Sequence, residues 1–305
     1  MNFSEQRQDV LLSVRTLLAD AIDYAGLFPP ANLSMSEAVI NYAAYRNSDF
    51  RWMLGRFVVT AARLGEFLEC ARDLVSGSVT DPWRLSVLVG EDVTETIHEI
   101  KEFNALNSPA ILCDMLEIKG DSAGIIENAA MSIPETVTAY FELSLDERLA
   151  DLVSTLAIRG QRAKIRTGGI TPESFPTSNE IVRFVRTCVA ANVPFKATAG
   201  LHHPVRCFRP LTYESNAPTG TMHGFLNFFL MTGFAREGYR PNLLVDLMEE
   251  EFEEVFRFEE QAAIWRDDYV LSQWQIAASR QKGIQSFGSC SFDEPIADMQ
   301  KLGIL

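Results

Sequence analysis

Short apolar runs alternate with longer amphipathic stretches along most of the chain. Runs rich in β-branched and aliphatic residues, typical of buried strands, occur at residues 21–28, 56–61, 84–89, 110–118, 136–143, 162–167, 195–199 and 284–289. Helical patterns follow most of them, at residues 34–46, 64–74, 93–104, 122–130, 145–158 and 179–191. Thr177 and Glu180 have the spacing of a capping box, which marks the start of the last of these helices.

Eight strand–helix units predict a parallel sheet, because consecutive parallel strands need a helical crossover. Eight such units close most naturally into an α/β fold of the (β/α)8 TIM-barrel type. An open doubly wound sheet would favour an early Gly-x-Gly-x-x-Gly turn, and none follows the first strands. Residues 1–20 are expected to form an N-terminal helix that closes the bottom of the barrel. We therefore expect residues 1–305 to form one barrel domain.

The regular alternation is interrupted between the seventh and eighth predicted strands. Residues 201–282 are far more than one helix and two short loops require, so we expect a largely helical insertion. It would contain a loop at residues 201–220 and helices at 221–236, 243–258 and 261–281. The second of these helices would carry an acid-rich run on a solvated face. A long segment at the carboxyl end of a barrel strand typically forms a wall or lid of the active site.

Composition narrows the range of partners. The chain has 27 Lys and Arg against 41 Asp and Glu, with a formal net charge of −14. Nucleic acid and anionic membranes would be repelled, so neither is expected as a partner, whereas a homo-oligomer remains compatible. Five scattered cysteines without a Cys-x-x-Cys pair are typical of free thiols in a reducing compartment. With neither a signal peptide nor a spanning segment evident, a cytoplasmic protein is expected.

Candidate chemistry lies where the sixth and seventh strands end. Alternate residues of a barrel strand point inward. The inward residues of these two strands are Lys164, Arg166, Gly168, Lys196, Thr198 and Gly200. Two lysines this close would lower each other's pKa, and a lysine with a lowered pKa can attack a carbonyl to form a Schiff base.

Carboxylates on the neighbouring strands could assist such an amine. Asp114 interrupts the apolar run of the fourth strand, and Glu142 lies near the end of the fifth. Beside a lysine, carboxylates can move protons during carbinolamine formation or C–C cleavage. The alternative is that buried lysines and carboxylates only neutralise one another.

These segments resemble, distantly, deoxyribose-phosphate aldolase and its class I aldolase relatives. The family's K-x-x-T-G and K-A-S-G-G runs are similar to residues 164–168 and 196–200, and a final G-T-S-S-like turn is similar to residues 288–291. The resemblance implies that Lys164 forms the Schiff base, Lys196 lowers its pKa and Asp114 moves protons, with Glu142 matching the family's strand-five Glu. It also implies phosphate binding by the turns that contain Gly168, Gly169, Gly200, Gly288 and Ser289.

The loop after the seventh strand adds further candidates. His202, His203 and Arg206 lie in the loop that begins after Gly200, where the family continues into a helix. One of these histidines could bind substrate or exchange protons, and Arg206 could help attract an anion. Alternatively, His202 or His203 could bind a metal together with His223 and an acidic residue.

The sequence therefore predicts a class I aldolase or lyase that forms a Schiff base with a small anionic carbonyl compound, either phosphorylated or carboxylated. No cofactor or metal is expected. Two alternatives stay open: a metal-dependent hydrolase or isomerase built on the histidines, and a non-catalytic barrel that binds small anions.

Overall fold

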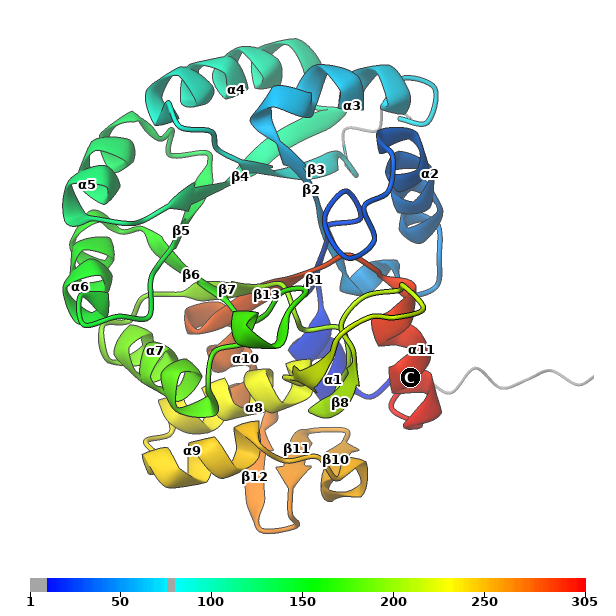
Figure 1. The fold of residues 1–305 in the computed structure, drawn as a ribbon, viewed down its shortest axis with the longest axis vertical. Helices are drawn as coiled ribbons and strands as arrows, with labels where there is room; N and C mark the ends of the chain where they lie inside the picture. Colours follow the sequence, from blue (N-terminus) through cyan, green and yellow to red (C-terminus); the bar gives the residue numbers. More distant parts are fainter. Residues whose placement is uncertain (1–9, 76–79) are drawn as a thin grey trace, which may run out of the picture.

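Eight parallel strands close into a barrel in the computed structural model, which describes residues 10–75 and 80–305 (Figure 1). The strands are β1 (Ile22–Tyr24), β2 (Leu54–Thr60), β3 (Trp83–Leu88), β4 (Ile111–Lys119), β5 (Thr138–Glu142), β6 (Arg162–Arg166), β7 (Phe195–Thr198) and β13 (Ile284–Ser289). Neighbours follow chain order around the ring, and β13 closes it between β7 and β1. The predicted (β/α)8 TIM barrel is confirmed, and each predicted apolar run overlaps one of its strands.

Helices surround the barrel and, apart from one that follows the last strand, connect its strands. They are α2 (Met35–Arg46), α3 (Leu64–Ala71), α4 (Val93–Asn107), α5 (Ala123–Ser132), α6 (Leu149–Arg159), α7 (Ser178–Ala190) and α11 (Asp293–Lys301), with short 3-10 turns η1 (Arg51–Met53), η2 (Ala61–Arg63) and η3 (Pro172–Ser174). The capping box at α7 is confirmed. The Thr177 hydroxyl accepts from the Glu180 N–H at 3.3 Å, and the Glu180 carboxylate accepts from the Thr177 N–H at 2.8 Å.

The N-terminal helix does not lie where the sequence predicts. α1 (Leu12–Leu18) packs against α10 (Gln273–Lys282) and a small antiparallel sheet, and Figure 1 shows it outside the ring of strands. Arg280 of α10 holds its end by donating to the Leu17 carbonyl at 2.6 Å. α1 therefore does not close the bottom of the barrel. Residues 1–9 of the predicted helix lie outside the described residues.

The insertion between β7 and β13 is mixed rather than helical. Its elements are the hairpin strands β8 (Cys207–Pro210) and β9 (Thr219–Met222), helices α8 (Phe225–Arg236) and α9 (Pro241–Met248), the turn η4 (Glu253–Val255), the strands β10 (Phe256–Glu259), β11 (Ala262–Trp265) and β12 (Tyr269–Ser272), and then α10. The helix predicted at 221–236 is confirmed for most of its length. The helices predicted at 243–258 and 261–281 are wrong between Met248 and Gln273, where a three-stranded antiparallel sheet forms.

Glu250 explains why the acid-rich run does not continue the helix. Its side chain is 2% exposed and accepts hydrogen bonds from Trp265 Nε1 at 3.2 Å and from Arg266 Nε at 2.7 Å. Burying that carboxylate needs these donors, and both come from the β11 strand and its turn. Arg266 and Asp267, with φ of 50° and 55°, then reverse the chain into β12. A long-range contact thus overrides the local helical pattern.

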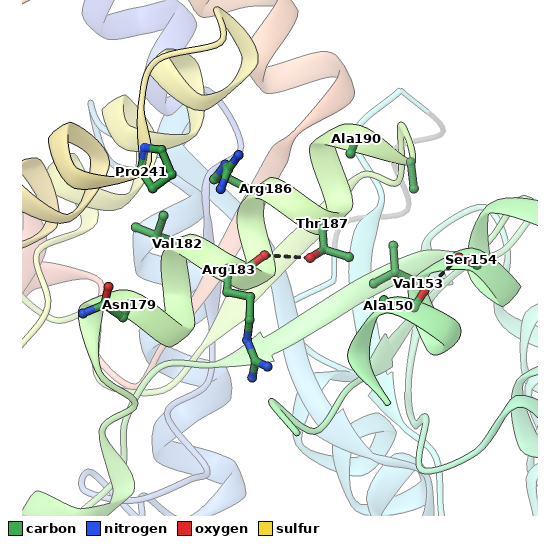
Figure 2. Close-up of a pocket in the computed structure, with 11 residues that line it drawn as sticks. Ala150, Val153, Ser154, Asn179, Val182, Arg183, Arg186, Thr187, Ala190 and Pro241 are labelled. Carbon is green, nitrogen blue, oxygen red and sulfur yellow. Dashed lines mark hydrogen bonds between the residues drawn. The ribbon is translucent and has the colours of Figure 1, made fainter. Parts of the chain in front are cut away.

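A shallow groove on the outer surface runs between α6 and α7 and reaches Pro241 at the start of α9 (Figure 2). Its volume is about 590 Å³. Arg183 and Arg186 of α7 line it among mainly small and aliphatic side chains. This groove lies on helices, away from the strand ends where barrel chemistry is normally located.

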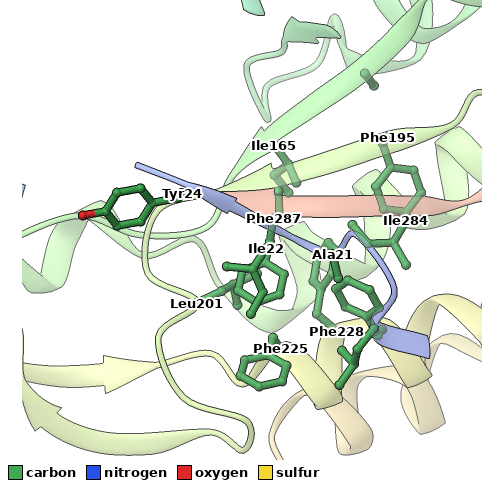
Figure 3. Packing of buried hydrophobic residues seen from close by; sticks show 14 of the residues in the cluster. Ala21, Ile22, Tyr24, Ile165, Phe195, Leu201, Phe225, Phe228, Ile284 and Phe287 are labelled. Atoms are coloured by element: carbon green, nitrogen blue, oxygen red, sulfur yellow. The ribbon is translucent and has the colours of Figure 1, made fainter. Parts of the chain in front are cut away.

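α8 attaches the insertion to the barrel. Its residues from Phe225 to Ala235 are all buried. Phe225 stacks on Phe287 of β13 with ring centroids 5.1 Å apart, and Phe228 meets Phe195 of β7 edge-on at 6.1 Å (Figure 3). The insertion therefore packs on the outside of β7 and β13.

α8 is too short to cross a bilayer, and no other helix of the described chain has the length and apolarity to do so.

Candidate active site

A cavity of about 400 Å³ opens where the carboxyl ends of the barrel strands meet. Seven of the residues singled out in the sequence line it: Lys164, Arg166, Gly168, Gly169, Thr198, His202 and Gly288. They lie on or shortly after β6, β7 and β13, and strand alternation predicts four of them: Lys164, Arg166, Gly168 and Thr198. The cavity is therefore the candidate active site.

The two lysines are neighbours in the β6–β7 register, and both are nearly or fully buried. Lys164 lines the cavity, whereas Lys196 is fully enclosed and is not part of the lining. Lys164 Nζ lies 2.6 Å from Glu117 Oε2 and 2.8 Å from Glu142 Oε2. Lys196 Nζ lies 2.8 Å from Glu117 Oε1 and 2.5 Å from Asp23 Oδ2. The pair is thus joined by a shared carboxylate.

That shared carboxylate, Glu117 of β4, was not identified from the sequence. Ser86 of β3 also donates to its Oε1 at 2.7 Å. Burial favours a raised pKa for Glu117, but Lys164 and Lys196 outweigh it and hold the pKa well below its usual range. Glu117 is therefore ionised and lies between the side-chain nitrogens of Lys164 and Lys196.

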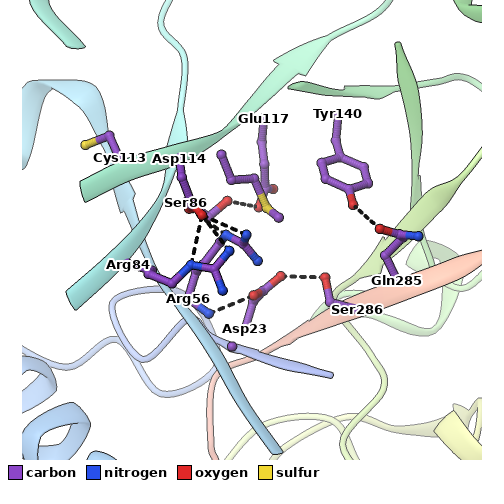
Figure 4. Close-up of polar contacts among 12 residues, drawn as sticks. Asp23, Arg56, Arg84, Ser86, Cys113, Asp114, Glu117, Tyr140, Gln285 and Ser286 are labelled. Atoms are coloured by element: carbon purple, nitrogen blue, oxygen red, sulfur yellow. Dashed lines mark hydrogen bonds and ion pairs between the residues drawn. The ribbon is translucent and has the colours of Figure 1, made fainter. Parts of the chain in front are cut away.

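Asp114, by contrast, does not lie beside the lysines. Arg56 of β2 binds its two carboxylate oxygens at 2.7 and 2.9 Å, and Arg84 of β3 approaches at 2.6 Å (Figure 4). Burial raises its pKa, yet the two arginines prevail and lower it. The β3–β4 register shifts at this point, with Cys113 opposite Leu85 and Met115 opposite Ser86. The carboxylate of β4 that contacts the lysines is therefore Glu117 and not Asp114.

Asp23 of β1 is a second residue that the sequence reading missed. Its Oδ2 accepts from Lys196 at 2.5 Å and from Ser286 Oγ at 2.7 Å, and its Oδ1 accepts from the Arg56 N–H at 2.8 Å. A Cβ at Gly55 would lie 2.4 Å from Asp23 Oδ1, so only glycine fits there. The available signal was an acidic residue inside the first apolar run.

Lys196 does not have the lowered pKa that the sequence suggests for it. Burial alone lowers the pKa of Lys196, but Asp23 and Glu117 more than compensate, and the net pKa is raised. Lys196 therefore stays an ammonium ion. Glu142 is likewise opposed by burial but has its pKa lowered by Lys164 and Arg166, whose Nε lies 3.2 Å away.

Two of the predicted backbone positions support the cavity without lining it. Gly200 has φ +77°, and a Cβ on it would lie 2.8 Å from the Gly168 Cα, so the β6 and β7 turns pack at a distance that only glycines allow. Ser289 is buried, and its carbonyl accepts from the Ala25 N–H at 2.7 Å. Gly200 and Ser289 therefore shape the mouth.

The loop histidines have separate surroundings. His202 lines the cavity, with its Nδ1 3.8 Å from Cys290 Sγ and 3.6 Å from Glu294 Oε2, and burial lowers its pKa to about 4. His203 pairs with Asp298 at 2.6 Å, and His223 Nε2 is 2.8 Å from the Pro176 carbonyl.

Because these histidines do not converge, the ligand set of the metal-dependent alternative does not assemble. Across residues 10–75 and 80–305, no group of three or more His, Cys, Asp or Glu side chains is arranged to hold a metal ion. Arg206 also lies apart from the cavity lining and pairs with Glu251 at 3.4 Å. The Lys and Arg side chains that line the cavity are Lys164 and Arg166.

Fold and site together define a (β/α)8 barrel with a buried, carboxylate-bridged lysine pair at the carboxyl ends of its strands. Comparisons of the chain with protein-family models, with curated proteins and with solved structures found no match.

Proposed function

We propose that this protein is a Schiff-base-forming lyase of the class I aldolase type that acts on a small carbonyl compound. One observation carries the proposal: of the two buried lysines, Lys164 alone lines the cavity, and its Nζ contacts two carboxylates. An amine that is accessible to a small molecule and adjacent to proton acceptors is the group that Schiff-base chemistry needs.

The reaction would begin with loss of a proton from Lys164. Glu142 Oε2, 2.8 Å from Nζ, can accept that proton, and the neutral amine then attacks the carbonyl carbon to give a carbinolamine. Loss of the carbinolamine hydroxyl as water, with the proton returned from Glu142, leaves an iminium ion. The electron pair of the C–C bond that breaks moves to the iminium and gives an enamine, while Glu142 takes the hydroxyl proton of the departing carbon, which leaves as an aldehyde or ketone. Return of that proton to the enamine carbon restores the iminium ion. Hydrolysis then releases the product and restores Lys164.

Lys196 would act as a positioning residue in this scheme. It is fully buried and binds Glu117, which in turn holds Lys164 Nζ at 2.6 Å. Its ammonium charge keeps Glu117 ionised and therefore fixes the place of the nucleophile. An anionic group of the substrate would meet Arg166, whose side chain is 55% exposed, and the backbone of Gly168 and Gly169.

Borohydride trapping tests the proposal. The protein is reduced in the presence of a panel of aldehydes and 2-oxo acids, and peptides are mapped by mass spectrometry. We expect an adduct on Lys164 that is lost in Lys164→Arg, which keeps the charge but cannot form the imine. Lys282→Arg, at the exposed last residue of α10, should leave trapping unchanged. A panel that yields no adduct on Lys164 contradicts the proposal.

The non-catalytic anion-binding alternative would use the same cations only as a clamp. Lys164 is already neutralised by Glu117 and Glu142, which makes it a weak clamp and favours proton transfer. Lys164→Arg separates the two functions, because a clamp retains anion binding in this variant whereas a lyase loses turnover.

A further inference from the structure

The candidate cavity has two chemically different halves. The segment after β1 contributes Ala25, Phe28 and Pro29, β2 contributes Val58, and β3 contributes Leu88. Every lining residue from this half is apolar. The charged lining residues Glu117, Lys164 and Arg166 come from β4 and β6: Glu117 lies beside Leu88 in the β3–β4 register, and Lys164 and Arg166 lie farther round the barrel on β6. A small molecule held between the halves would meet the nucleophile at one end and an apolar wall at the other.

We propose that the substrate is a carbonyl compound with an aliphatic or aromatic substituent and at most one carboxylate, rather than a phosphorylated sugar. This inference rests on the proposed function, because it takes Lys164 as the group that the carbonyl meets. A cavity of about 400 Å³ suits such a compound, since sites for small ligands span roughly 300–1,000 Å³.

Charge balance argues against a phosphate. The cations at the polar end are Lys164, Lys196 and Arg166, and the anions paired with them are Asp23, Glu117 and Glu142. The cluster is therefore neutral, with each cation already bound to a carboxylate. A dianionic group would have to displace Glu142 from Arg166, whereas one carboxylate can share the exposed edge of that guanidinium.

The hydroxyl groups of a sugar-like substrate would also find few hydrogen-bond partners on the apolar side of the cavity. The hydroxyl side chains of the lining, Ser174 and Thr198, come from the β6 and β7 ends. A polyhydroxylated chain placed against Phe28, Val58 and Leu88 would leave its hydroxyls without hydrogen bonds, which is costly in an apolar environment. An alkyl or aryl group gains there instead by leaving water.

The apolar wall is held in place before any ligand arrives. The Ala25 N–H donates to the Ser289 carbonyl at 2.7 Å, and the Phe28 N–H donates to the Ala25 carbonyl at 2.9 Å. The Leu33 N–H closes the same loop onto the Gly26 carbonyl at 2.9 Å. These bonds tie the loop that carries Phe28 to the end of β13, so binding requires little ordering of the wall.

Calorimetry on the Lys164→Arg variant tests recognition without imine formation. The probes are pyruvate, 4-methyl-2-oxopentanoate and glyceraldehyde 3-phosphate. We expect the branched oxo acid to bind at least tenfold more tightly than either of the others. Adding Leu88→Gln or, separately, Phe28→Gln should remove most of this preference, whereas Ile125→Gln on the partly exposed face of α5 should leave it intact.

Equal or tighter binding of pyruvate or the phosphorylated aldehyde would overturn the inference, as would a preference that survives in both folded wall variants. Failure of the proposed function is distinguishable. In that case borohydride gives no lysine adduct with any probe, whatever the order of affinities. Conversely, adducts on Lys164 that form equally well with all three probes support the lyase and contradict the apolar substrate.

Discussion

Glu117 is the residue on which the site depends most. Its carboxylate forms ion pairs with Lys164 and Lys196 and accepts a hydrogen bond from Ser86, and its side chain is only 3% exposed. Removing one partner of a buried ion pair leaves a buried charge without compensation, which destabilises the fold more than replacing the whole pair by apolar residues would. Asp23 and Glu142 each neutralise one lysine, but Glu117 contacts both.

Glu117→Gln is therefore expected to lower the free energy of unfolding by about 3–5 kcal/mol, the usual cost of breaking a buried ion pair. Urea unfolding followed by circular dichroism measures the change. Glu66→Gln provides the matched control, because Glu66 pairs with Arg63 on the exposed surface and its loss should hardly affect unfolding. Similar stabilities for the two variants would mean that the cluster does not hold the barrel interior together.

At the scale of elements, Asn227 fastens the insertion together. It lies fully buried in α8, and its Nδ2 donates to the Leu247 carbonyl at 2.8 Å and to the Glu250 carbonyl at 2.9 Å. Its Oδ1 accepts from the Arg206 N–H at 3.0 Å. One side chain thus satisfies backbone groups from the end of α9, the acid-rich run and the loop before β8.

Asn227→Ala would remove the partner of the Glu250 carbonyl and of the Arg206 N–H, whereas the Leu247 carbonyl would keep the Glu250 N–H at 3.3 Å. Each unsatisfied group costs about 1–3 kcal/mol, so the variant should be clearly destabilised. Hydrogen exchange should rise first in residues 241–272, which depend on these bonds. Asn47→Ala, which removes a hydrogen bond to the Ala43 carbonyl on the exposed end of α2, is the control. Unchanged exchange in the insertion would contradict the assignment.

For the whole molecule, the buried charges define a pH range of stability. The pKa of Glu117 is lowered in the folded protein, and the pKa of Lys196 is raised. As pH falls through the ordinary Glu value of about 4.3, the unfolded chain takes up a proton that folded Glu117 refuses, so stability is lost. As pH rises above the ordinary Lys value of about 10.4, the unfolded chain releases a proton that folded Lys196 keeps, and stability is lost again.

We therefore expect the contribution of Glu117 and Lys196 to the free energy of unfolding to be greatest between about pH 5 and pH 10. Urea unfolding at a series of pH values measures it. In Glu117→Gln the acid-side slope should become shallower, because one carboxylate with a lowered pKa is gone. Asp114 and Glu142, whose pKa values are also lowered, would maintain the remaining slope. An identical acid-side slope in the variant would contradict the linkage to Glu117.

The periodicity of the sequence was sufficient to predict the barrel and part of its candidate active site. Alternation along β6 and β7 correctly placed Lys164 at the mouth, because a two-residue period depends only on neighbouring backbone. The same alternation failed on β4, since the shifted register at Asp114 changes which residue meets the lysines. Bulges of this kind depend on the partner strand and leave no clear local signal.

The sequence by itself determined the eight-stranded parallel barrel, the position of the insertion and the lysine pair, because these follow from hydrophobic period and chain order. Only the tertiary structure decided that Glu117 and Asp23 neutralise the lysines, that the histidines separate, and that the acid-rich run ends in a sheet. The first and the last of these outcomes depend on burying a charged group, and a buried charge is stable only where distant parts of the chain supply its partner.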